Sequence, residues 1–121
     1  MPWDTVERLE DGGVVLHAMF IAPRESWGDD WESSFPPRSL PLSLDDTVTD
    51  INDNFEGQPD HIYADRVGAR VNGWAIDVLV FYGGGDRTAV PPVRRAPSAE
   101  ARAAAQEQLA RLVVPARRTD G

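Results

Sequence analysis

The sequence lacks two residue types that carry much of protein chemistry, cysteine and lysine. Without cysteine there are no disulfides, no thiolate nucleophiles and no zinc or iron–sulfur sites built on sulfur ligands. Without lysine there is no Schiff-base chemistry and no lysine general base. Catalysis would depend on Asp, Glu, Ser, Thr, Tyr, Arg and two histidines, and the fold must be held together by packing alone.

Long hydrophobic runs are also missing. The longest one, near residues 13–22, contains His17 and is too short to span a bilayer. The N-terminus is acidic and lacks the basic residues with which a signal peptide begins. We therefore expect a cytoplasmic protein that has no membrane partner.

The composition is that of a small folded domain. The chain has 121 residues, 41% of them hydrophobic and 26% charged, which is close to ordinary globular usage. A chain of this length buries roughly two thirds of the surface that its unfolded form exposes, so one domain suffices. We place that domain at residues 1–114 and expect a flexible C-terminal tail at residues 115–121. Ten glycines and ten prolines predict long loops.

The net charge of -8 is divided unevenly between the two halves of the chain. Residues 1–60 contain 14 acids and 3 arginines, whereas residues 61–121 contain 6 acids and 9 arginines. Such a dipolar molecule steers a basic partner to its N-terminal half. Binding of DNA or RNA through that half is disfavoured, because both nucleic acids are anionic.

The first half of the chain is predicted to form two strands and a helix. Residues 5–22 are typical of a β-hairpin around Asp11-Gly12-Gly13, whose glycines allow the positive φ of a tight turn. The second of these strands, about residues 14–22, is nearly all apolar and should be central. Ser43 and Asp46 form a capping-box-like helix start. Four apolar residues at helical spacing follow: Leu44, Val48, Ile51 and Phe55.

The second half is predicted to form another hairpin and a helix. Residues 61–71 and 74–82 flank Asn72-Gly73, a pair that suits the two positive φ angles of a type I′ turn. Both faces of residues 74–82 are largely apolar, so this strand should lie inside the sheet. The last helix is predicted to begin after Ser98 and to end at Pro115. Its apolar stripe consists of Ala101, Ala105, Leu109 and Leu112.

The resulting order, β-β-α-β-β-α, defines an α+β fold. The simplest packing is a four-stranded antiparallel sheet with both helices on one face, since each hairpin is followed by a helix that can cover it. The loop at residues 23–42 must then cross an edge of the sheet or its open face.

That loop contains the acidic aromatic stretch "SWGDDWESSF", which has two interpretations. In the first, its aromatic side chains fold back as a lid over the sheet, because a small domain can hardly spare three of them from its core. In the second, the stretch is a recognition surface for a basic protein partner. The residues of that surface would be Trp27, Asp29, Asp30, Trp31 and Glu32.

Metal and phosphate sites are weakly indicated. Asp50, Asn52 and Asn54 have the spacing of a calcium loop, but Phe55 replaces its glycine and His61 replaces its final glutamate. "GGGD" at residues 83–86 lacks the rest of a phosphate-binding loop, so we expect its glycines only to let the chain leave the sheet. We expect no cofactor and no metal.

The C-terminal third, "VNGWAIDVLVFYG" followed by "PSAEARAAAQEQLARLVVP", resembles the closing strand and helix of small uncharacterised actinobacterial domains. The resemblance implies a source and a strand-to-helix finish. It implies no activity and no site residue.

Our leading hypothesis is a noncatalytic protein-interaction domain, such as an immunity-type inhibitor of a toxin or an accessory subunit, that binds a basic protein through its acidic half. The alternative is a small-molecule binder or a minor enzyme with a pocket between the sheet and residues 23–42. His17, His61 and Arg70 would be the polar groups of that pocket. Self-association stays open, because strand edges and an apolar sheet face are features that pair two copies.

Overall fold

The computed structural model describes residues 3–24, 28, 31–46 and 59–115. Its elements, in chain order, are α1 (Trp3–Glu7), β1 (Val14–Ile21), α2 (Trp31–Ser34), the 3-10 helix η2 (Leu44–Asp46), β2 (Tyr63–Val71), β3 (Trp74–Tyr82) and α3 (Ala99–Ala110). The predicted α+β class is confirmed. The sheet has three strands among the described residues, where four were predicted.

The sheet is antiparallel throughout, in the order β1-β3-β2. The predicted hairpin between β2 and β3 is confirmed, and both turn residues have the positive φ that the sequence required, 53° at Asn72 and 85° at Gly73. β3 is buried along nearly its whole length, as its two apolar faces predicted. The predicted central position of residues 14–22 is wrong, because β1 lies at an edge and its side chains are mostly half-buried.

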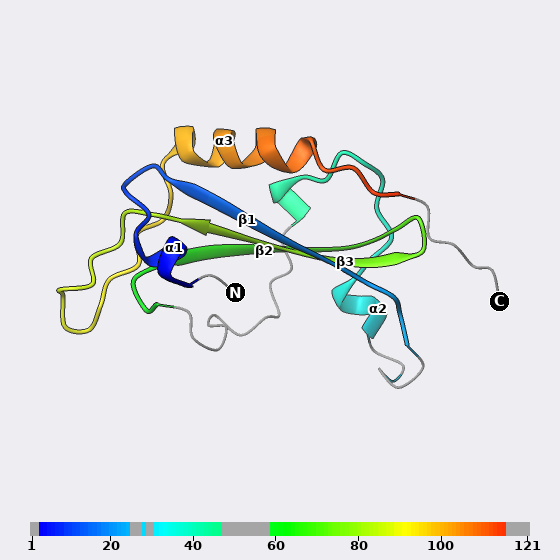
Figure 1. Ribbon diagram of the computed structural model, residues 1–121, viewed down its shortest axis with the longest axis horizontal. Helices are drawn as coiled ribbons and strands as arrows, with labels where there is room; N and C mark the ends of the chain where they lie inside the picture. Colours follow the sequence, from blue (N-terminus) through cyan, green and yellow to red (C-terminus); the bar gives the residue numbers. More distant parts are fainter. Residues whose placement is uncertain (1–2, 25–27, 29–30, 47–58, 116–121) are drawn as a thin grey trace.

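The two faces of the sheet are covered by different helices. α3 lies along one face, and α1 and α2 lie on the opposite side (Figure 1). Under α3, Ala101, Ala105 and Leu109 pack on a core that includes Ile76 and Val80 of β3. On the other face, α1 contributes to a second, smaller cluster of buried residues: Val6, Ile62, Leu79 and Phe81. Neither α1 nor α2 was predicted. Of the first predicted helix, Leu44 in η2 packs in the same core as α3, and residues 47–58 lie outside the described residues, so the placement of both predicted helices on one face stays a prediction.

The predicted first strand is the short helix α1. Trp3, Val6 and Leu9 are spaced by three residues, which places them on one side of a helical turn and against the sheet. Trp3 meets Phe81 edge to face at 5.4 Å between ring centroids, and Val6 is completely buried. Residues 3–7 therefore form a helix, as the three-residue spacing of these apolar side chains favours, and not the strand that the following glycines predicted.

The two predicted helices differ from the observed ones at their ends. Of the helix predicted from Ser43 to Phe55, residues 44–46 form η2 and residues 47–58 lie outside the described residues. Ser98 caps α3 as predicted, and its hydroxyl accepts from the N–H of Ala101 at 3.1 Å. The helix ends at Ala110 and not at Pro115, because the last residues turn onto the hairpin. There the carbonyl of Val114 accepts from the Asn72 side chain at 2.9 Å.

Two of the three glycines after β3 are required by close backbone contacts. A Cβ on Gly83 would lie 2.0 Å from the carbonyl oxygen of Glu10, and one on Gly85 would lie 1.7 Å from the carbonyl oxygen of His61. Three chain segments therefore cross at this point, and a side chain would push them apart. The glycines do more than release the chain from the sheet, which was all that the sequence predicted.

Among the described residues, no helix is long and apolar enough to cross a membrane.

We expect Gly85→Ala to lower the free energy of unfolding by at least about 3 kcal/mol, since the new methyl group meets backbone and not a flexible side chain. Urea unfolding measures this loss. Gly28→Ala is the matched control, because Gly28 has a φ of +80° but nothing within 4 Å of the added Cβ. Its cost should be only about 1 kcal/mol, and equal costs at the two positions would contradict the crossing.

Candidate functional site

The face of the sheet opposite α3 carries a buried ion pair. Asp77 of β3 lies in register with Met19 of β1 and Gly68 of β2, and Arg66 lies one row along β2 on the same face. The guanidinium of Arg66 donates to both carboxylate oxygens of Asp77, at 2.6 Å from Nε and 2.7 Å from the terminal nitrogen. The Asp77 side chain is 7% exposed and that of Arg66 21%.

This pair has a structural role. A carboxylate that accepts two charge-assisted hydrogen bonds from one guanidinium is held in a fixed orientation. Gly68, which has no side chain, is the β2 residue directly opposite Asp77. The pair thus satisfies the only charged side chain of the central strand and does not leave it free as a general base.

Further along the same face, the aromatic stretch packs against Arg70 of β2. The Arg70 guanidinium carbon lies 5.4 Å from the ring centroid of Trp31, and its Nε donates to the carbonyl of Phe35 at 2.6 Å. The Trp31 and Phe35 rings lie 6.3 Å apart, and Phe35 is buried. Glu32, one residue after Trp31, is exposed. Trp31 and Phe35 therefore cover the sheet, which is the geometry of the lid interpretation.

The other predicted partner-binding residues, Trp27, Asp29 and Asp30, lie outside the described residues.

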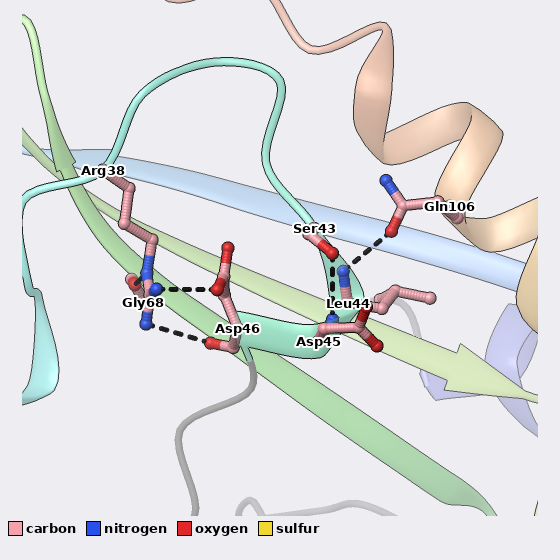
Figure 2. Close-up of polar contacts among 7 residues, drawn as sticks. All are labelled: Arg38, Ser43, Leu44, Asp45, Asp46, Gly68 and Gln106. Atoms are coloured by element: carbon pink, nitrogen blue, oxygen red, sulfur yellow. Dashed lines mark hydrogen bonds and ion pairs between the residues drawn. The ribbon is translucent and has the colours of Figure 1, made fainter.

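Arg38 closes the outer edge of β2 (Figure 2). Its backbone N–H donates to the carbonyl of Arg70, while the N–H of Arg70 donates to the carbonyl of Pro36 at 2.9 Å. Its side chain then donates from Nε to the carbonyl of Gly68 at 3.0 Å and pairs with the Asp46 carboxylate at 2.9 Å. Arg38 thereby donates hydrogen bonds to the carbonyls of both Gly68 and Arg70, which point away from β3.

Gln106 of α3 ties the same segment to the helix. Its side-chain oxygen accepts from the N–H of Leu44 at 2.8 Å, and its side-chain nitrogen donates to the carbonyl of Leu42 at 3.0 Å. The Ser43 hydroxyl accepts from the N–H of Asp45 at 3.1 Å, so the predicted serine start does cap the short turn (Figure 2). Residues 36–46 are thus fastened to β2 on one side and to α3 on the other.

The polar residues of the small-molecule alternative are not brought together. His61 is buried in the turn before β2, where its carbonyl lies close to Gly85. Arg70 lies near the far end of β2, nine residues later, which is about 30 Å along a strand. His17 lies on β1 in the row of Leu79 and Arg66, between the two. Among the described residues, no group of three or more metal-ligating side chains is placed to hold an ion.

A second polar pair lies on the α3 side of the sheet. The Tyr82 hydroxyl donates to the Asp65 carboxylate at 3.0 Å, and the Tyr82 side chain is almost completely buried. Burial, followed by the nearby Asp65 charge, raises the pKa of Tyr82 far above its ordinary value. The phenol therefore stays protonated and serves as a hydrogen-bond donor in the core.

Comparison with known proteins identifies no relative. No family model matches the chain, and no curated protein and no solved structure matches it either.

We expect Arg66→Met to lower the free energy of unfolding by about 3–5 kcal/mol, because it leaves the Asp77 carboxylate buried without its partner. The double variant Arg66→Met, Asp77→Leu removes the charge as well and should recover most of that loss. Chemical denaturation of the wild type, both single variants and the double variant gives the coupling energy. Additive losses in the double variant would contradict a buried, coupled pair.

We expect the protein to lose stability above pH about 10, where the unfolded chain loses the Tyr82 proton and the folded chain keeps it. The raised folded pKa contributes stability that is fully present below the unfolded pKa, so the loss begins there and amounts to about 1.4 kcal/mol per pH unit. With neither lysine nor cysteine in the chain, tyrosines are the side chains that titrate in this range. Urea unfolding between pH 8 and 11 measures the slope.

The control for this pH dependence is the other tyrosine. Tyr63→Phe should keep the alkaline slope and Tyr82→Phe should abolish it, after correction for the lost hydrogen bond to Asp65. A slope that survives in Tyr82→Phe would assign the effect to a different group.

Proposed function

We propose that this chain is a noncatalytic protein-interaction domain that binds a basic protein surface through acidic side chains of its N-terminal half. An inhibitor of a basic toxin and an accessory subunit of a larger assembly both fit this description. The proposal rests on how the charges are used. Inside the fold, Arg66 is paired with Asp77. Among the described acids of the N-terminal half, all except Asp46 are exposed, and Glu7 forms an exposed ion pair with Arg87 at 3.5 Å.

The exposed acids support the proposal by their position. The sheet face opposite α3 bears both α1 and α2 (Figure 1). The exposed acids of α1, of the turn after it and of α2 are Asp4, Glu7, Glu10, Asp11 and Glu32. By contrast, the exposed surface of α3 carries acids and arginines together. A basic partner is therefore attracted to the α1 and α2 side.

The contact between Trp31 and Arg70 narrows the set of residues that would contact the protein partner. Trp31 and Phe35 are half-buried and buried, respectively, and engage Arg70, so they hold the α2 segment in place. Glu32 on the same short helix is exposed and is a contact residue in this proposal. Trp31 then acts by positioning Glu32. Trp27, Asp29 and Asp30 remain candidate contacts that extend the same acidic stretch.

We expect the variant Asp4→Asn, Glu32→Gln to lose most of a bound basic partner while it keeps its fold, because both side chains are exposed. The experiment is affinity capture from a lysate of the host with tagged protein, followed by identification and titration of the captured protein. Loss of two rim charges should weaken binding by several-fold to about tenfold and flatten its salt dependence.

The matched control is Glu100→Gln, Glu107→Gln, which removes the same charge from exposed positions on α3. It should bind the partner like the wild type. Equal losses in both variants would show a dependence on net charge alone and no dedicated acidic face. Absence of any basic partner of the wild type would also overturn the proposal.

A further inference from the structure

The two edge strands of the sheet, β1 and β2, differ in how their outward backbone groups are hydrogen-bonded. In the β2–β3 pairing, the even-numbered residues of β2 direct their N–H and C=O groups outward. The Pro36–Arg38 segment meets both groups of Arg70 and the carbonyl of Gly68. That edge is covered at Gly68 and Arg70 by backbone hydrogen bonds and one guanidinium. β1 forms the opposite edge.

The outward groups of β1 follow from its register. The N–H of Gly83 donates to the carbonyl of Gly13, so these two residues form a hydrogen-bonded pair. Hydrogen-bonded pairs alternate along an antiparallel ladder, which directs the odd-numbered residues of β1 toward β3 and the even-numbered ones away from it. The outward residues are Val14, Leu16, Ala18 and Phe20. Within the described parts of the chain, nothing bonds to their outward N–H and C=O groups.

An unpaired edge of this kind is unusual in its chemistry. Natural proteins protect edge strands with charged side chains, prolines or bulges. β1 has none of these over its eight residues, "VVLHAMFI", which pair in unbroken register with β3. Ala18, in the middle of the strand, is exposed and too small to shield the backbone.

We propose that β1 pairs with β1 of a second copy of this chain, antiparallel, to form a continuous six-stranded sheet. Outward residues must pair with outward residues, and the register that uses all of them places Val14 opposite Phe20 and Leu16 opposite Ala18. Each of the four pairs exchanges two hydrogen bonds. His17 then lies opposite His17 of the second copy on the two-fold axis, at a pair that is not hydrogen-bonded.

The charges at the ends of β1 favour a second copy over an unrelated strand. The strand itself carries no charged side chain that would select an acidic or a basic peptide. The exposed acids Glu10 and Asp11 precede it, and the exposed Arg24 follows it. In this antiparallel register Glu10 of each copy lies opposite Arg24 of the other, so one pair of opposite charges forms at each end of the paired strands.

One strand from each copy makes a small interface, so we expect weak association with a Kd in the range of about 1–100 μM. Sedimentation equilibrium over protein concentrations that bracket this range should show a monomer–dimer equilibrium. A wild-type protein that stays monomeric up to about 500 μM would overturn the proposal.

Ala18→Pro tests whether the edge mediates association. The N–H at this position points away from β3, so proline leaves the β1–β3 ladder intact, as proline on an edge strand does. It removes one donor to the second copy and places its ring in the plane of the new pair. We expect dimerisation to weaken by at least tenfold, while the control Ala18→Ser dimerises like the wild type. Undiminished dimerisation of a folded Ala18→Pro would overturn the proposal.

Cysteine cross-linking tests the register and does not depend on the proline variant. Because the chain has no cysteine, each substitution introduces a single thiol. His17→Cys should oxidise to a covalent dimer, since residues at such a pair have Cα atoms about 4.5 Å apart, within reach of a disulfide. Met19→Cys should not, because Met19 faces Val15 of the second copy and lies about 13 Å along the strand from its own equivalent. Equal cross-linking of both variants, or of neither, would overturn this register.

Discussion

Burial of β3 on both faces is the constraint on which the rest of the structure depends. A central strand with apolar side chains above and below has to be covered on both faces, and the described residues include one long helix for this purpose. α3 covers one face. The other face receives α1 at one end and the Trp31–Phe35 segment at the other, so the short N-terminal helices exist because that second face must be excluded from water.

The same constraint explains the polar interior. A charged residue in a doubly covered strand needs a partner inside the fold, and Asp77 finds it in Arg66, while Tyr82 on the α3 side finds Asp65. Arg70 is likewise engaged by Trp31 and Phe35. The arginines of β2 are therefore used to hold the second face together, and among the described acids of the N-terminal half all except Asp46 stay exposed.

The sequence predicts what depends on local chemistry. The Asn72-Gly73 turn, the buried length of β3, the Ser98 cap and the α+β class follow from residue types at fixed spacing, and all of them are observed. The strand order could not be predicted, since an apolar strand such as β1 has the same pattern at an edge as at the centre. α1 was missed because the glycines at 12 and 13 outweighed the three-residue spacing of Trp3, Val6 and Leu9.

The candidate site was predicted in part, for the same reason. The lid interpretation identified the packing of Trp31 and Phe35, but not Arg70 as the group they meet. The Arg66–Asp77 pair was missed, although the hairpin register fixed by Asn72-Gly73 already places Arg66 one row from Asp77 on the same face. Arg38 had no comparable signal, because its partners Gly68 and Asp46 are 30 and 8 residues away along the chain.

The proposed β1 pairing and the proposed acidic binding face are connected through symmetry. Two antiparallel strands of one sheet are related by an axis perpendicular to that sheet, so a dimer through β1 keeps α1 and α2 of both copies on the same side. The acidic surfaces of two copies then add into one continuous face with α3 of both copies on the other. A basic partner that presents two patches gains from binding the second copy without any new type of contact. If β1 pairs and the acidic face binds as proposed, weak pairing would control how strongly that face binds, since the protein concentration would set the fraction of dimers that a partner meets.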